Sequence, residues 1–206
     1  MNKKWYAIVT FCILISSFGT QAHVEIDSLL SVSNDSIHVK FQTHFYEALK
    51  QKALENYSKA IDALVICKSL NSTESAVFHE LGTNYFKLKQ FENSEFNFQK
   101  AISLDEANFW YKESLYHLYI EQNRFEEAII ALKPLLSRHP DYKQDLVNLY
   151  LEAGRYDDAL NVLDDLDKTL GLKASRDKIR KELYDLSGDE NKRITHLKIR
   201  LQETPG

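Results

Sequence analysis

Residues 77–142 read VFHELGTNYFKLKQFENSEFNFQKAISLDEANFWYKESLYHLYIEQNRFEEAIIALKPLLSRHPDY and contain one pattern twice, offset by 34 residues. The aligned pairs are Leu81 with Leu115, Tyr85 with Tyr119, Phe91 with Phe125, and Ser94 with Ala128. Each copy predicts a helix, a tight turn and a second helix. Since a helix pair of this length cannot bury its apolar face alone, each copy must stack on a neighbour like itself.

At these residues the chain resembles the tetratricopeptide repeat family. The residues that carry the resemblance are Leu81-Gly82, Tyr85 and Phe98 in the first copy, and Ala128 and Pro140 in the next. The resemblance implies an all-α fold, a right-handed solenoid of about five antiparallel helix hairpins. It also implies a class of function, a noncatalytic scaffold for protein–protein interaction.

Three sets of equivalent positions extend the pattern along the chain. Small residues recur at steps of 34, 34 and 31, namely Ala60, Ser94, Ala128 and Ala159. An aromatic residue lies three positions before each: Tyr57, Phe91, Phe125 and Tyr156. A third set follows the first helices at steps of 34, 31 and 34: Tyr85, Tyr119, Tyr150 and Tyr184. The shared irregular step predicts hairpins at about 37–71, 74–106, 108–139, 141–171 and 174–206.

Individual residues predict local departures from this regular array. Arg193 occupies the small-residue position of the fifth hairpin, so we expect that hairpin to be splayed. Pro134 should kink the second helix of the third hairpin, whereas Pro140 should open a helix, where its missing N–H is tolerated. Gly154 and Gly188 fit turns that need unusual backbone angles.

The first 22 residues have the layout of a secretory signal peptide. Lys3 and Lys4 precede an apolar run from Trp5 to Ile15, and cleavage is expected after Ala22. The alternative, a retained anchor, is disfavoured because the run is shorter than the ~20 residues that span a bilayer. Together with the repeats, this segment makes the chain resemble an exported, bacterial-type tetratricopeptide repeat protein.

Export would place the remainder of the chain in the periplasm or cell envelope, or outside the cell, with no membrane span after signal cleavage. Residues 23–36 predict a polar linker, and residues 37–206 the repeat array. After cleavage Cys67 is the one remaining cysteine, and its place in the apolar phase of a helix predicts a buried, inert thiol.

Composition argues against several function classes. The formal net charge is −4 and no basic block is present, which disfavours nucleic acid as a partner. The sequence has no glycine-rich phosphate loop, no Gly-x-Ser-x-Gly turn and no paired cysteines. We therefore expect no enzyme activity and no cofactor.

One polar cluster leaves two interpretations open. Glu113, His117 and Glu121 are spaced by four and share one helix face, where two carboxylates and an imidazole could bind a metal. The alternative is an ordinary polar face stabilised by pairs four residues apart.

In arrays of the family that the chain resembles, the first helix of each hairpin lines the concave groove. The positions of this chain that match are His79, Thr83, Phe86, Lys87, Trp110, Glu113, His117, Ile120, Glu121, Gln144, Asn148, Leu151 and Glu152. Trp110 could instead pack between adjacent hairpins. Family members that bind a terminal carboxylate use a lysine and asparagines, but here Gln144 replaces the lysine and Ile179 the second asparagine. The resemblance therefore does not extend to that carboxylate site.

These observations predict a scaffold that binds a peptide segment or an assembly partner in its groove. The alternative is an exported binder of a small molecule, metal or glycan through the polar groove cluster. At the C-terminal end, Ile194, Leu197 and Leu201 form a stripe that could be buried against Tyr184, while Ile199 lies outside it. Self-association or continuation of the array is therefore possible at the C-terminal repeat.

Overall fold

The computed structural model describes residues 35–171 and 173–203, with backbone alone for residues 199–203. This part of the chain is all-α, as predicted, and contains no strand. Helical residues 35–53 precede α2 (Tyr57–Leu70), α3 (Ser75–Lys87), α4 (Phe91–Leu104), α5 (Phe109–Glu121), α6 (Phe125–Leu132), α7 (Lys143–Glu152), α8 (Tyr156–Leu170), α9 (Ala174–Ser187) and α10 (Glu190–Glu203). Two short 3-10 helices, Lys133–Leu135 and Pro140–Tyr142, lie between α6 and α7.

The chain divides into two compact units, with the boundary between Val77 and Phe78 inside α3. The proposed signal peptide and nearly all of the 23–36 linker lie outside the described residues, although residues 35 and 36 are already helical. None of the described helices is both long enough and apolar enough to cross a bilayer.

In the first unit, α2 buries one face that includes Cys67. Its thiol is fully buried, with Sγ 3.7 Å from the Phe41 carbonyl oxygen, which confirms the predicted buried cysteine. Burial raises the pKa of the Cys67 thiol because the thiolate would lose its hydration.

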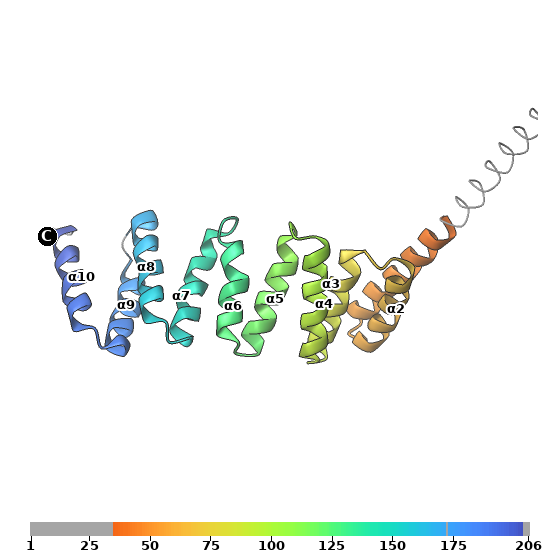
Figure 1. Cartoon of the computed structure of the whole chain (residues 1–206), viewed down its shortest axis with the longest axis horizontal. Helices are drawn as coiled ribbons and strands as arrows, with labels where there is room; N and C mark the ends of the chain where they lie inside the picture. The colour runs from red at the N-terminus through yellow and green to blue at the C-terminus, as the bar shows by residue number, and fades with distance from the viewer. Residues whose placement is uncertain (1–34, 172, 204–206) are drawn as a thin grey trace, which may run out of the picture. The chain divides into compact units, whose positions relative to one another are not determined.

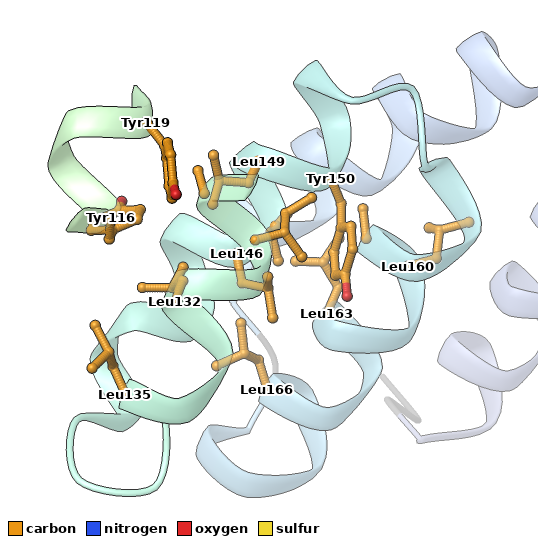
Figure 2. Packing of buried hydrophobic residues seen from close by; sticks show 14 of the residues in the cluster. Tyr116, Tyr119, Leu132, Leu135, Leu146, Leu149, Tyr150, Leu160, Leu163 and Leu166 are labelled. Atoms are coloured by element: carbon orange, nitrogen blue, oxygen red, sulfur yellow. The ribbon is translucent and has the colours of Figure 1, made fainter. Parts of the chain in front are cut away.

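The main core cluster of the second unit runs from Phe98 on α4 to Tyr184 on α9, and a smaller cluster joins Phe78, Ala101 and Tyr111. Figure 2 shows the central part of the main cluster, in which Tyr150 of α7 lies beside Leu160 and Leu163 of α8. Within this unit successive helices reverse direction (Figure 1), and every helix from α4 to α9 contributes residues to the main core cluster. The stacking demanded by the repeated pattern is therefore present.

The predicted register is confirmed residue by residue. All four small residues at the expected positions are 0% exposed: Ala60, Ser94, Ala128 and Ala159. The second helices begin at the four predicted aromatic residues, Tyr57, Phe91, Phe125 and Tyr156. At Ser94 the helices approach so closely that its Oγ donates to the Gly82 carbonyl oxygen at 2.8 Å. A Cβ added to Gly82 would lie 2.5 Å from the Phe98 ring.

Each hairpin turn contains one residue in the left-handed region, at steps of 34, 34, 31 and 34. These residues are Glu55 (φ 60°), Lys89 (φ 58°), Asn123 (φ 56°), Gly154 (φ 70°) and Gly188 (φ 67°). In the first four turns the next residue donates its N–H to the carbonyl five positions earlier, as in Gln90 to Tyr85 at 2.9 Å. This closure satisfies carbonyls that the helix end leaves free. The glycine turns were predicted from the sequence, but the other three were not.

The prediction for Pro140 is confirmed, but Pro134 lies beyond the end of the helix that it was expected to kink. Helix α6 ends at Leu132, and Pro134 lies in the 3-10 helix that follows. Pro140 is the first residue of the second 3-10 helix, which leads directly into α7.

Ion pairs link the second helices of neighbouring hairpins. The Arg124 guanidinium covers the Tyr119 ring at 4.6 Å and donates to Glu95 on α4 at 2.5 Å. In the next hairpin, Arg155 covers Tyr150 at 4.8 Å and donates to Glu126 on α6 at 3.1 Å. These pairs are partly exposed, so they fix geometry more than they add stability.

A buried charge network joins α8 to α9. Arg180, 2% exposed, donates to Asp164 at 2.5 Å and to Asp167 at 2.8 Å. Asp167 also accepts from the buried Arg176 at 2.6 Å. Breaking such a network is costly, because it leaves a charge buried without its partner.

The packing predicted for the last helix is wrong. Ile194 and Leu197 are 42% and 52% exposed, and His196 instead faces the Tyr184 ring at 6.1 Å. Cavities of about 660 and 260 Å³ flank α10, in agreement with the expected splaying. Arg193, at the small-residue position, donates to Asp185 on α9 at 3.2 Å. The side chains of Ile199 and Leu201 lie outside the described residues.

Candidate partner-binding face

Polar and aromatic side chains gather on one face of α5 and one face of α7. By helical spacing this α5–α7 face consists of Trp110, Glu113, His117 and Glu121 on α5 with Gln144, Asp145, Asn148 and Glu152 on α7. The two helices meet where the Tyr142 hydroxyl, just before α7, donates to the Glu113 carboxylate. All the predicted groove residues of α5 and α7 except Ile120 and Leu151 belong to this face.

Trp110 is the most prominent side chain of the face. Asn108 caps α5 by accepting the Trp110 backbone N–H at 3.1 Å, which fixes where the helix starts. The indole meets the Phe109 ring edge-on at 5.6 Å, yet the residue is 65% exposed. Trp110 is therefore not packed between hairpins, and its aromatic surface is available to a partner.

Buried tyrosines lie beneath the polar groups. Tyr116 is 7% exposed, and burial together with the nearby Asp145 carboxylate raises its pKa to about 12. The bond to Glu113, with burial, raises the pKa of Tyr142 to about 12 as well. Both phenols therefore stay protonated and uncharged well above neutral pH.

Asp145 is a half-buried carboxylate at the centre of the face. Burial raises its pKa, and the nearby His117 imidazole lowers it by a smaller amount. His117 is itself exposed, and its ring lies 4.9 Å from that of Tyr116. No hydrogen bond or ion pair reaches the Asp145 carboxylate from the described part of the chain.

The polar cluster does not converge on a common centre. Glu113 accepts from Tyr142, whereas Glu121 pairs with Lys89. Within residues 35–171 and 173–198, no group of three His, Cys, Asp or Glu side chains is placed to hold a metal ion. These contacts fit the interpretation as a polar helix face.

The predicted groove residues of α3 have mainly local roles. His79 shares a 2.8 Å hydrogen bond with Ser114 on α5, and its ring lies 4.8 Å from that of Tyr111. The Thr83 hydroxyl donates to the His79 carbonyl at 2.9 Å. Phe86 packs against the core, which leaves the exposed Lys87 as the residue that could meet a partner.

On α5 and α7 the apolar candidates serve the core and the polar ones face outward. Ile120 and Leu151 are half-buried against the core cluster. Gln144 is half-buried, and Asn148 and Glu152 are exposed. Ile179 also packs against the core, so no asparagine-type ligand stands at that position.

Sequence reasoning missed Asp145 and Tyr142. Asp145, Asn148 and Glu152 follow the spacing of one helix face, and this signal could have identified Asp145. Tyr142 lies in a 3-10 helix before α7, and nothing in the sequence pairs it with Glu113.

Comparisons with known proteins agree with this architecture. Residues 75–108 match the tetratricopeptide repeat model. A search of curated protein sequences finds no match. Among solved structures, MamA has a TM-score of 0.60 at 15% identity, covering 79% of this chain and 91% of its own.

Two peptide-binding structures are also similar. YrrB, described as having an unusual peptide-binding site, has a TM-score of 0.58 at 13% identity, covering 77% of this chain and 84% of its own. The first repeat domain of Spaghetti (RPAP3), bound to the HSP90 peptide SRMEEVD, has a TM-score of 0.52 at 17% identity, covering 56% of this chain and 94% of its own. The chain thus contains a tetratricopeptide repeat at residues 75–108 and has the fold of tetratricopeptide repeat proteins.

Proposed function

We propose that the protein is a noncatalytic scaffold that binds an extended segment of a partner protein on its α5–α7 face. The observation that carries the proposal is Trp110, which is 65% exposed beside a row of polar side chains. A large aromatic residue among polar groups is the usual composition of a protein interface, where it supplies affinity and its neighbours fix register.

The similar structures support this class of function. The descriptions of YrrB and RPAP3 name peptide binding, and both share this fold at low sequence identity. In the RPAP3 structure the peptide is acidic. In this chain Gln144 and Ile179 stand where carboxylate-binding family members have a lysine and an asparagine. The partner segment is therefore not one that is bound through its terminal carboxylate.

The N-terminal sequence adds a location to the proposal. The basic pair Lys3-Lys4 and the apolar run to Ile15 favour export, so the partner would be met in the periplasm, at the cell envelope or outside the cell.

A capture experiment tests the proposed face. The tagged chain is expressed in its native host, and co-purifying proteins are identified by mass spectrometry. Trp110→Ala combined with Asn148→Arg should remove the specific partners, because one change deletes the aromatic surface and the other adds a bulky charge to an exposed site.

The matched control makes comparable substitutions on second helices, an aromatic residue to alanine and an asparagine to arginine. Phe96 on α4 is 61% exposed and Asn161 on α8 is exposed, so Phe96→Ala with Asn161→Arg makes comparable chemical changes elsewhere. This variant should retain the partners. Loss of capture in the control but not in the Trp110 variant would move the interface to the second helices and refute the proposal.

A further inference from the structure

The α5–α7 face has an excess of negative charge, and we infer that its partner segment is cationic, with separate lysine or arginine side chains received by Asp145 and by Glu152. This inference rests on the proposed function and names the chemistry of the partner. It follows from the charges left unpaired on the face, from the burial of Asp145, and from the exposed indole of Trp110.

The acidic groups of the face fall into two kinds. Glu113 and Glu121 are already engaged, by Tyr142 and Lys89 respectively. Asp145 and Glu152 make no hydrogen bond or ion pair with the described part of the chain. Two carboxylates on α7, about two turns apart along its length, therefore remain available to a ligand.

The cations of the same two helices do not balance these carboxylates. Lys143 pairs with Asp165 on α8 and so is directed toward the second helix of its own hairpin. Lys112 lies on another side of α5, about 140° from the face by helical spacing. His117 is the remaining basic group of the face, and it is the group that lowers the pKa of Asp145.

Asp145 gains more from a cation than a fully solvated carboxylate would. It is half-buried beside Tyr116 and loses hydration without receiving a donor in return. An ammonium or guanidinium group supplied by a partner would provide that donor at a site that has already lost part of its water. An anionic segment would meet repulsion at the same place.

Trp110 suits the same kind of ligand. Its exposed indole can cover the flat face of a guanidinium or the stem of a lysine, as Tyr119 and Tyr150 already do for Arg124 and Arg155. The chain thus uses aromatic–cation contacts inside its own array. The indole of Trp110 offers a similar aromatic surface, and no cation among the described residues covers it.

The test begins with a selection that assumes no partner sequence. A random peptide library is displayed on phage and selected on the full-length chain, after subtraction on the Trp110→Ala, Asn148→Arg variant. Peptides that survive should contain lysine and arginine several-fold more often than aspartate and glutamate. Surviving peptides of neutral or acidic composition would overturn the cationic inference while leaving the proposed face intact. An empty selection would overturn both.

Affinities then test the role of individual carboxylates. In a Trp5→Phe background Trp110 is the sole tryptophan, so its fluorescence reports binding of the best selected peptide. Asp145→Asn should weaken peptide binding roughly tenfold, because one ion pair of this kind contributes about a factor of ten to the affinity. Glu152→Gln, at an exposed residue, should weaken it by a smaller factor and provides a second measurement if Asp145→Asn fails to fold.

The control removes one negative charge elsewhere. Glu92 is exposed at the start of α4, so Glu92→Gln should leave the affinity unchanged. Raising the salt concentration should weaken peptide binding equally for the parent protein and Glu92→Gln. The same increase should weaken peptide binding by Asp145→Asn to a smaller extent, because one of the attracting charges is gone. Equal affinities for the parent, Asp145→Asn and Glu152→Gln would overturn the inference.

Discussion

The left-handed turn residues allow a sharp test of what holds each hairpin together. Glu55, Lys89 and Gly154 occupy equivalent turns with φ between 58° and 70°. We predict that Glu55→Gly stabilises the protein, Gly154→Ala destabilises it, and Lys89→Gly changes little. All three changes act at the same backbone position, so their differences must come from the side chains.

The expected magnitudes follow from two opposing effects. A residue other than glycine in this region costs roughly 1–2 kcal/mol, whereas glycine adds roughly 0.5–1 kcal/mol of unfolded-state entropy to be lost on folding. The Glu55 side chain is exposed and makes no contact with a described partner, so Glu55→Gly should gain about 0.5–1 kcal/mol. Gly154→Ala should cost about the same amount, because no atom lies within 4 Å of the new Cβ and only the backbone is affected.

Lys89→Gly differs because its side chain makes contacts. Its ammonium pairs with Glu121 and lies 5.9 and 5.7 Å from the centres of the Phe86 and Phe91 rings. At an exposed site these contacts together contribute on the order of 1 kcal/mol, which offsets the relief of backbone strain.

Urea denaturation followed by far-ultraviolet circular dichroism measures all three changes on one scale. The urea midpoint of Glu55→Gly should lie above that of the parent protein, and the midpoint of Gly154→Ala should lie below it. The midpoint of Lys89→Gly should lie close to that of the parent. If Glu55→Gly lowered the midpoint, or Gly154→Ala left it unmoved, the conformational cost assigned to these turns would be wrong.

Four further outcomes are expected. Ala128→Leu should destabilise the protein by roughly 1–3 kcal/mol, seen as a lower melting temperature, because Ala128 is 0% exposed at a helix crossing. Arg180→Ala should cost about 3–5 kcal/mol in denaturant titration, since it leaves the carboxylate of the buried Asp167 without one of its donors. Cys67 should react with a disulfide reagent only as fast as the first unit opens, because the thiol is buried and its raised pKa disfavours the thiolate; rapid reaction in native buffer would contradict this. Protein recovered from an exporting host should have the mass of a chain that starts after Ala22, and an intact leader would instead indicate a retained anchor.

The periodic part of the fold was readable from the sequence because it depends on one residue type at one position. A small side chain at Ala128 or Ala159 has a simple cause, the close approach of two helices, and that cause repeats in the first four hairpins. The aromatic residues that open the second helices are equally constrained. Where Arg193 breaks the rule, the sequence correctly indicated the altered hairpin but not which face of α10 it would expose.

The candidate face was harder to predict because contacts between repeats decide it. Spacing alone places His79 and Trp110 on equivalent helices, yet His79 bonds to Ser114 while Trp110 stays exposed. Likewise Glu113 is engaged by Tyr142, a partner 29 residues away in a 3-10 helix. Periodicity identifies the side of a helix, but the neighbour's side chains determine which residues remain available.

The segment between α6 and α7 has a consequence for engineering. The repeat step falls from 34 to 31 residues there, yet Ala159 is as well buried as Ala128, so the missing residues were absorbed without disturbing the register of either hairpin. The stretch from Ser137 to Asp141 is exposed and joins two hairpins that are held together by the core. A reporter peptide or protease site inserted into this stretch should therefore be accommodated, giving a way to label the protein internally without altering either end of the chain.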